Sequence, residues 1–187
     1  RSHYLATYHA TTNHEQELID LNLQNGLSEF SELFGFLSKT FIASNYLWSS
    51  KLHKTLSDNK VIAIQGQRVQ LDPNFKLNKL KKIRHYTGQR NNFNQIYTVR
   101  NSVFEPYSDL KCDWVEKTMR DIDNAFFWNT PSIIVTHRVN YVSTMSLKNK
   151  ERNLNLLDLL LKKIIKKYPN VEFLSSDELA DEINKTK

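Results

Sequence analysis

Short apolar segments alternate with amphipathic segments along most of this chain, and this alternation is the feature that most restricts its fold. The predicted strands are, in chain order, Tyr4–His9, Thr40–Tyr46, Val61–Gln67, Gln95–Arg100, Ser132–Thr136 and Val171–Ser175. Consecutive apolar residues in a strand are typical of a parallel sheet that is buried on both faces. Strands that alternate with helices, without hairpin signals between them, indicate an α/β protein whose parallel sheet is open or closed into a barrel.

Helical periodicity separates these strands. The predicted helices are Leu18–Phe34, Trp48–Ser57, Asp113–Trp128, Lys150–Tyr168 and a last one that begins at Ser176. Thr12 or Asn13 can cap the first helix, and Gly35 is expected to end it, because glycine adopts the left-handed conformation that terminates helices. Pro169 stops the fourth helix, because proline cannot continue one.

Residues 68–94 are basic and polar with weak periodicity, and they are predicted to cross the surface with one short helix. Charge is concentrated here, in residues 76–84, and again in residues 162–167. The net charge of +6 raises the possibility of nucleic-acid binding. These lysines alternate with Leu and Ile, however, which is the usual pattern of the solvated face of an amphipathic element. A solvated surface is therefore the favoured interpretation, and nucleic acid is an unlikely partner.

Length and composition indicate one globular domain. The chain has 187 residues, 40% of them hydrophobic, and contains no apolar run near the roughly 20 residues of a membrane helix. No signal-peptide pattern is present in residues 1–5. The single cysteine, Cys112, excludes an intrachain disulfide and a cysteine-based zinc site. We therefore expect a single domain over residues 1–187 that does not cross a membrane.

Polar side chains stand where the predicted strands end. In a parallel barrel these ends meet at one rim, even when they are far apart in sequence. The residues at these ends are His9, Asn45, Tyr46, Gln65, Gln67, Arg100, Asn101, His137, Arg138 and Ser175, with His14 and Trp48 close by. Histidines, amides and aromatic rings together predict a metal or acid/base centre beside a sugar-stacking surface.

Simpler interpretations of these residues remain open. His137 could be a hydrogen-bonded core histidine, His9 and His14 could be loop residues, and Trp48 could belong to the core. No Gly-x-Gly-x-x-Gly or Gly-Lys-Ser/Thr pattern is present, so the common phosphate-binding loops are absent from this sequence. A carbohydrate or small-molecule site is the better hypothesis.

Four segments resemble the polysaccharide deacetylase-like superfamily, and in particular its uncharacterised bacterial members. The segments are Phe41–Trp48, Ile64–Val69, Ser132–Tyr141 and Val171–Leu179. The resemblance extends from about Thr7 to Ile183 and depends on the order of the segments more than on one motif. It implies a distorted (β/α) barrel with a divalent metal, zinc or similar, at its rim, and removal of acetyl groups from N-acetylated sugars.

The resemblance also implies roles for single residues. An apolar strand that ends in a general-acid histidine matches Ile133–His137. The family also has a strand that ends in Arg-x-Pro-Tyr. Ala43–Tyr46 matches this motif loosely, because it lacks the Arg and the Pro. The family's His-x-x-x-His metal motif is met by His9 and His14, one residue further apart. The implied sites are therefore a catalytic His137, metal ligands His9 and His14, and substrate-binding residues Asn45, Tyr46, Trp48, Gln65 and Arg138.

The family's paired aspartates, which supply a base and the third metal ligand, have no counterpart, since no Asp precedes Asp20. The expectation is that this chain is the C-terminal portion of the domain, lacking one or more N-terminal strands. The first hypothesis is a metal-assisted deacetylase in which His137 protonates the leaving amine. The alternative is a catalytically inactive barrel of the same superfamily that binds a glycan or a protein partner.

Overall fold

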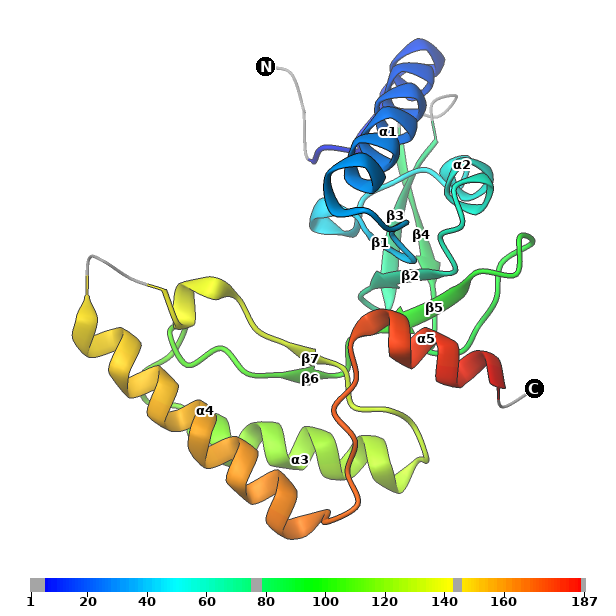
Figure 1. The fold of residues 1–187 in the computed structure, drawn as a ribbon. Helices are drawn as coiled ribbons and strands as arrows, with labels where there is room; N and C mark the ends of the chain where they lie inside the picture. Colours follow the sequence, from blue (N-terminus) through cyan, green and yellow to red (C-terminus); the bar gives the residue numbers. More distant parts are fainter. Residues whose placement is uncertain (1–5, 75–78, 143–145, 186–187) are drawn as a thin grey trace. The chain divides into compact units, whose positions relative to one another are not determined.

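The computed structural model describes residues 6–74, 79–142 and 146–185, and the chain forms two compact units (Figure 1). The first unit contains Arg1–Val99 and Leu174–Lys187, and the second contains Arg100–Phe173. Each unit has its own apolar cluster. The prediction of a single domain stays a prediction.

The first unit is built on a three-stranded parallel sheet. Its strands are β1 (Thr40–Ile42), β2 (Ala63–Gly66) and β5 (Ile96–Val99), in the order β1-β2-β5. The register pairs Phe41 with Ile64 and Ile64 with Tyr97, so these three side chains lie on one face. They belong to a buried cluster with residues of helices α1 (Asn13–Phe34) and α2 (Leu52–Asp58), including Leu23, Leu52 and Leu56. Helix α5 (Ser176–Lys185) packs against β2.

The ends of helix α1 form as the sequence predicts. The hydroxyl of Thr12 accepts a hydrogen bond from the backbone N–H of Glu15, which satisfies one of the free donors at the helix start. Gly35 follows the last turn with φ +74°. A Cβ is unfavourable in this left-handed conformation, so glycine is the residue suited to this position.

Residues 69–74 and 79–84 form an antiparallel hairpin. The sequence predicted a surface segment with one short helix there. Strands β3 (Val69–Asn74) and β4 (Lys79–Arg84) pair from Val69 opposite Arg84 to Asn74 opposite Lys79. The prediction for residues 68–94 was wrong in these strands, because alternating Lys with Leu and Ile has the period of a strand as well as that of a charged surface.

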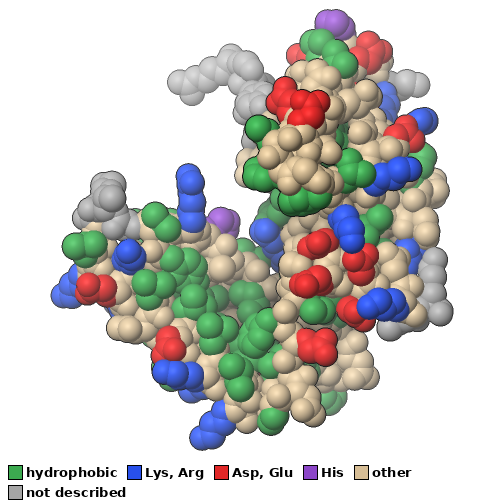
Figure 2. Space-filling view, in the orientation of Figure 1, with side chains coloured by type: hydrophobic (Ala, Val, Ile, Leu, Met, Phe, Trp, Pro, Cys, Tyr) green, Lys and Arg blue, Asp and Glu red, His purple; other side chains and the backbone are tan. Residues whose placement is uncertain are grey.

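The second unit combines a short parallel strand pair with two helices. Strands β6 (Ser102–Val103) and β7 (Ile134–Val135) are parallel, and the helices are α3 (Trp114–Phe127) and α4 (Leu147–Lys167). Phe104, Met119, Ile122, Leu160 and Ile164 are buried between them. Figure 2 shows hydrophobic side chains gathered on the surface of this unit. The exposed apolar residues of α4 include Leu154, Leu161 and Ile165. The helices therefore carry more apolar surface than the packing within the unit buries.

Three predictions about strands are corrected. Residues 6–8 form a bend and a turn rather than a strand, with the N–H of His9 donating to the Ala6 carbonyl; the rest of that predicted strand lies outside the described residues. Residues 171–175 are irregular. The strand before His137 is only two residues long and partly exposed, because one strand neighbour and the nearby helices cover it incompletely.

The structure confirms an α/β fold with a parallel sheet of three strands. Over residues 6–74, 79–142 and 146–185 the strands form three separate sheets and no closed barrel. No helix in these ranges is long and apolar enough to cross a membrane.

Candidate functional site

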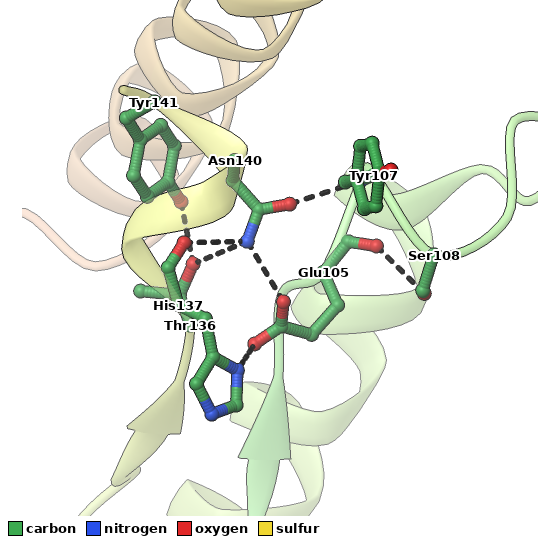
Figure 3. Close-up of polar contacts among 7 residues, drawn as sticks. All are labelled: Glu105, Tyr107, Ser108, Thr136, His137, Asn140 and Tyr141. Carbon is green, nitrogen blue, oxygen red and sulfur yellow. Dashed lines mark hydrogen bonds and ion pairs between the residues drawn. The ribbon is translucent and has the colours of Figure 1, made fainter. Parts of the chain in front are cut away.

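His137 and Glu105 form a hydrogen-bonded pair in the second unit. Glu105 follows β6 and His137 follows β7, and these parallel neighbours bring their carboxyl ends to the same edge. The imidazole Nδ1 lies 2.6 Å from Oε1 of Glu105 (Figure 3). The Glu105 side chain is 15% exposed and that of His137 is 64% exposed. A largely buried carboxylate therefore holds an imidazole that solvent can reach.

Asn140 fixes the Glu105 carboxylate from the other side. Its Nδ2 donates to Oε2 of Glu105 over 2.7 Å and to the carbonyl of His137 over 2.8 Å. Its Oδ1 accepts from the backbone N–H of Tyr107 over 2.9 Å. Asn140 is fully buried, and Nδ2 of Asn153 donates to its carbonyl. These bonds orient both oxygens of Glu105 before any ligand arrives.

The pair has the geometry of an acid/base centre. When neutral His137 donates from Nδ1 to Glu105, its Nε2 carries the lone pair; when protonated, Nε2 carries a proton to donate. Figure 3 shows Nε2 on the side of the ring away from Glu105. A carboxylate that fixes one nitrogen and leaves the other facing outward is the arrangement used in histidine catalysis. The same arrangement also suits a histidine that binds a metal.

Tyr141 and Thr136 lie beside the pair. Their hydroxyl oxygens are 2.7 Å apart (Figure 3). Burial raises the pKa of the Tyr141 phenol, and the negative charge of Glu105 raises it further, while the hydrogen bond with Thr136 lowers it. Tyr141 is therefore a neutral phenol near pH 7, and it can donate or accept a hydrogen bond.

A second candidate site is a pocket in the first unit, at the carboxyl ends of β2 and β5. The residues that line it are Tyr46, Trp48, Ile64, Gln65, Gly66, Gln67, Gln70, His85, Tyr97, Thr98 and Val99. Ligands in parallel α/β folds bind beyond the carboxyl ends of the strands. The cavity measures about 10 Å³, room for about one water molecule. Its aromatic rings and amide side chains, with no Asp or Glu among them, suit contact with an uncharged hydroxyl group rather than enclosure of a whole ligand.

Tyr46 reaches this pocket from a strained backbone. Residues 44–46 form a short 3-10 turn after β1, in which Asn45 has φ 52° and Tyr46 has φ 54°. Positive φ is costly for a residue as bulky as tyrosine. A Cβ added at Gly66 would lie 3.8 Å from Cδ1 of Tyr46, so the ring passes close to the β2 backbone. Asn45 itself is exposed beside the pocket-lining Tyr46.

Hydrogen bonds hold two buried histidines, His85 in the lining of the pocket and His53 against Tyr97. The His85 ring stacks on Tyr97 with centroids 3.7 Å apart, and its Nε2 lies 2.9 Å from Oε1 of Gln70. His53 Nε2 lies 3.0 Å from the Tyr97 hydroxyl. Burial lowers the pKa of His53 to about 4, with a smaller effect from His85, and raises that of Tyr97 to about 12. Burial also lowers the pKa of His85. These groups are therefore neutral near pH 7.

The predicted site residues lie in both units. Tyr46, Trp48 and Gln65 lie at one pocket of the first unit, although Trp48 is only 3% exposed and packs in the core against Phe41 and His53. Arg138 is exposed next to His137 in the second unit. His9 follows a turn, and His14 is exposed on the first turn of α1.

The donor set of the predicted metal centre is small. Within the described ranges no three His, Cys, Asp or Glu side chains are grouped as a metal site would require. His9 and His14 would supply two imidazoles, and a divalent zinc site in proteins uses at least three protein ligands. The residues present do not by themselves fit a divalent metal.

The sequence alone did not identify four structurally important residues. Glu105 and Asn140 build the His137 pair, and His85 and Gln70 line the pocket. Glu105 lies 32 positions before His137, so only the parallel pairing of β6 with β7 brings them together. His85 and Gln70 belong to the hairpin that the sequence did not reveal. The position of Glu105 just after an apolar segment is the one signal that could have identified it.

Comparison of the chain with protein-family models, curated proteins and solved structures gives no significant match.

Proposed function

We propose that this chain belongs to a deacetylase-like carbohydrate hydrolase that acts on N-acetylated sugars, with His137 as its proton donor. The observation that carries the proposal is the pair formed by Glu105 and His137, in which a largely buried carboxylate orients an exposed imidazole. The resemblance of residues 133–137 to the last motif of polysaccharide deacetylases supports the same role.

Amide hydrolysis explains why such a pair is needed. Water adds to the acetyl carbonyl, the C–N bond breaks, and the sugar nitrogen must gain a proton to leave as an amine. Protonated His137 delivers that proton from Nε2, while Glu105 stabilises the imidazolium through Nδ1. In polysaccharide deacetylases, which this chain resembles, an Asp takes the proton of the attacking water. This sequence does not contain a matching residue. His137 is therefore proposed for the leaving-group step.

The resemblance assigns substrate binding to Asn45, Tyr46, Trp48, Gln65 and Arg138, and these roles belong to the proposal. Tyr46 offers a partly exposed ring, Gln65 offers an amide, and Trp48 closes the wall behind them. Asn45 and Arg138 complete the substrate-binding set that the resemblance implies. A distorted (β/α) barrel in which the described strands take part also belongs to the proposal. So does a divalent metal, for which His9 and His14 would supply two of at least three protein ligands.

Acetate release tests the proposal. The full chain is incubated with chitin oligomers, and the wild type is compared with His137→Ala and with the control Lys150→Ala, which lies on α4. We expect His137→Ala to abolish acetate release while its circular dichroism and unfolding midpoint stay close to wild type, because His137 is exposed and contributes little packing. Equal activity of His137→Ala and wild type would refute the assignment.

A non-catalytic glycan-binding protein is the second candidate. Aromatic rings and amides without Asp or Glu line the pocket of the first unit, and such groups can contact a sugar at the protein surface without an acid/base centre. Calorimetry with chitin oligomers separates the two functions. Binding that is weakened by Gln65→Ala, together with no acetate release by the wild type, favours the second candidate.

A further inference from the structure

A second cavity of the first unit lies at the amino ends of β1 and β2, where Thr40 begins β1 and Ile62 precedes β2. The described residues that line it all belong to the first unit. Its volume is about 710 Å³, within the roughly 300–1,000 Å³ of sites that hold small molecules. We name it the amino-end cavity.

Apolar side chains form one part of the wall of the amino-end cavity. They come from the last turns of α1, from the connection to β1 and from the residue before β2, and they are Phe30, Phe36, Leu37 and Ile62. The Phe36 ring meets that of Phe30 edge-on, with centroids 5.4 Å apart. Phe36 is nevertheless 60% exposed and Leu37 is 50% exposed. Large apolar side chains that stay exposed beside a cavity suit contact with an apolar ligand.

Three charged residues of the lining already have partners. The ammonium group of Lys39 lies 2.9 Å from Oδ2 of Asp181. Asp177 lies in the first turn of α5, where hydrogen bonds from the Ser175 side chain and from backbone N–H groups lower the pKa of its carboxyl. These two carboxylates and one ammonium group are therefore occupied within the protein.

Lys60 is the charged residue of the lining that remains. It is exposed, and it takes part in none of the ion pairs among the described residues. Asp58, the acid closest to it in sequence, is paired with Lys54 over 2.6 Å. The amino-end cavity therefore presents one unpaired positive charge beside an apolar wall.

Lys60 also occupies a backbone position that suits glycine. Its φ is +66°, and its N–H donates to the carbonyl of Ser57 over 3.0 Å. The N–H of Val61 donates to the carbonyl of Leu56 over 2.9 Å. These two bonds form the Schellman end of α2, in which the left-handed residue is usually glycine, as Gly35 is at the end of α1. A lysine in this conformation lowers stability, which favours a role for its side chain.

We propose that the amino-end cavity binds a small carboxylic acid with an apolar body. The carboxylate pairs with the ammonium group of Lys60, and the body lies against Phe36 and Leu37. A simpler explanation is that Lys60 only keeps the edge of an apolar surface hydrated, but any polar residue would do this, and glycine or asparagine would do so without the strain. The cavity includes neither Glu105 nor His137, so the inference does not depend on the proposed function.

Calorimetric titration of the full chain at neutral pH tests the proposal, with octanoate, phenylbutyrate, octanol and octylammonium as probes. We expect saturable binding of at least one of the two acids, weaker binding of octanol, and the weakest binding of octylammonium, because Lys60 repels a second cation. Tighter binding of octanoate assigns an aliphatic body and tighter binding of phenylbutyrate an aromatic one, and either result supports the proposal. Absence of binding by both acids, or equal affinity for octanol, would overturn it.

Substitutions locate the two parts of the site. Lys60→Gln should weaken binding of the preferred acid about fivefold and leave octanol binding unchanged, because an exposed ion pair contributes about that much to affinity. Lys82→Gln removes the same charge from β4, outside the cavity, and should keep wild-type affinity. Phe36→Ser should weaken binding of the acids and of octanol alike, whereas Phe93→Ser, at another exposed phenylalanine, should not. Equal affinity of Lys60→Gln and Lys82→Gln for the acid would refute the site.

Lys60→Gly separates the side chain from the fold. Glycine fits the left-handed conformation, so the midpoint of urea unfolding should rise, while affinity for the acid should fall as it does in Lys60→Gln. A Lys60→Gly protein that binds the acid as tightly as wild type would contradict the proposal.

Discussion

Glu105 decides which nitrogen of His137 faces outward. One carboxylate oxygen contacts Nδ1, and the other is held by Asn140. Without these two hydrogen bonds, the imidazole of His137 would sample many orientations and both tautomers. The contribution of Glu105 is therefore positional, and a substitution that keeps the shape but changes the hydrogen bonding should separate it from a structural role.

Glu105→Gln is expected to reverse the tautomer of His137. The amide oxygen can still accept from Asn140, and the amide N–H then faces Nδ1, which must act as an acceptor and leave the proton on Nε2. Acetate release should fall about 10- to 100-fold, the usual effect of losing an outer partner of a functional imidazole. The ¹⁵N shifts of the His137 ring report the tautomer directly.

Glu151→Gln, on the exposed side of α4, is the control and should leave both the rate and the ring shifts unchanged. A Glu105→Gln protein with the wild-type tautomer and rate would show that Glu105 does not position His137.

His53 and His85 should make folding sensitive to mild acid. Burial lowers the pKa of both in the folded state, that of His53 to about 4, while their unfolded values stay near 6.5. The unfolded chain therefore binds protons first, so the free energy of unfolding should fall as pH decreases from about 6.5 to 4. The contribution of His53 is at most about 3 kcal/mol.

Urea unfolding between pH 7 and 4.5 measures this effect. His53→Gln should flatten the pH dependence, because glutamine does not titrate, whereas His14→Gln at the exposed start of α1 should keep it. An identical slope in wild type and His53→Gln would contradict the assignment.

At the scale of elements, two glycines affect helix α1 in opposite ways. Gly26 lies within the continuous helix, and an added Cβ there meets no atom within 4 Å. Gly35 ends the helix with φ +74°. We expect Gly26→Ala to raise the free energy of unfolding by up to about 1 kcal/mol, because alanine loses less backbone entropy. Gly35→Ala should lower it by about 1–2 kcal/mol, because the left-handed conformation strains a Cβ.

Chemical denaturation of the two variants gives both values, with each glycine serving as the control for the other. If both variants changed the free energy of unfolding in the same direction, the end of helix α1 at Gly35 would be contradicted.

At the scale of the whole molecule, two apolar clusters stabilise the chain. Leu52 is completely buried in the first cluster and Leu160 is 1% exposed in the second. Each Leu→Ala substitution should cost about 2–5 kcal/mol, through lost transfer energy and the cavity that remains. The single-domain prediction further implies that either substitution weakens protection in both units.

Native-state hydrogen exchange, followed by mass spectrometry, separates peptides of residues 100–173 from the others. Under the single-domain prediction, Leu160→Ala should reduce protection of the slowest-exchanging amides around β2 as well as those of α4. Loss confined to residues 100–173 would instead mean that the two units unfold independently.

Local sequence signals were sufficient where the structure depends on local contacts. The α/β class, the periodic helices α1, α3 and α4, the Thr12 cap and the Gly35 stop follow from residues within a few positions of one another. The position of His137 after an apolar strand was also predictable, because the strand pattern and its polar end are contiguous. The alternating Lys, Leu and Ile of β4 form an equally local pattern, but this pattern is compatible with a strand and with a charged surface segment.

Only the tertiary structure decided the partners. The pairing of Glu105 with His137, the burial of Asn140 and the stacking of His85 on Tyr97 join residues that are 12 to 35 positions apart. Such contacts depend on strand register and on which face of a sheet is covered, and neither is encoded in a short window of sequence. The sequence by itself therefore determined which elements form and marked His137, whereas packing determined that a buried carboxylate supports His137 and that a basic hairpin borders the pocket.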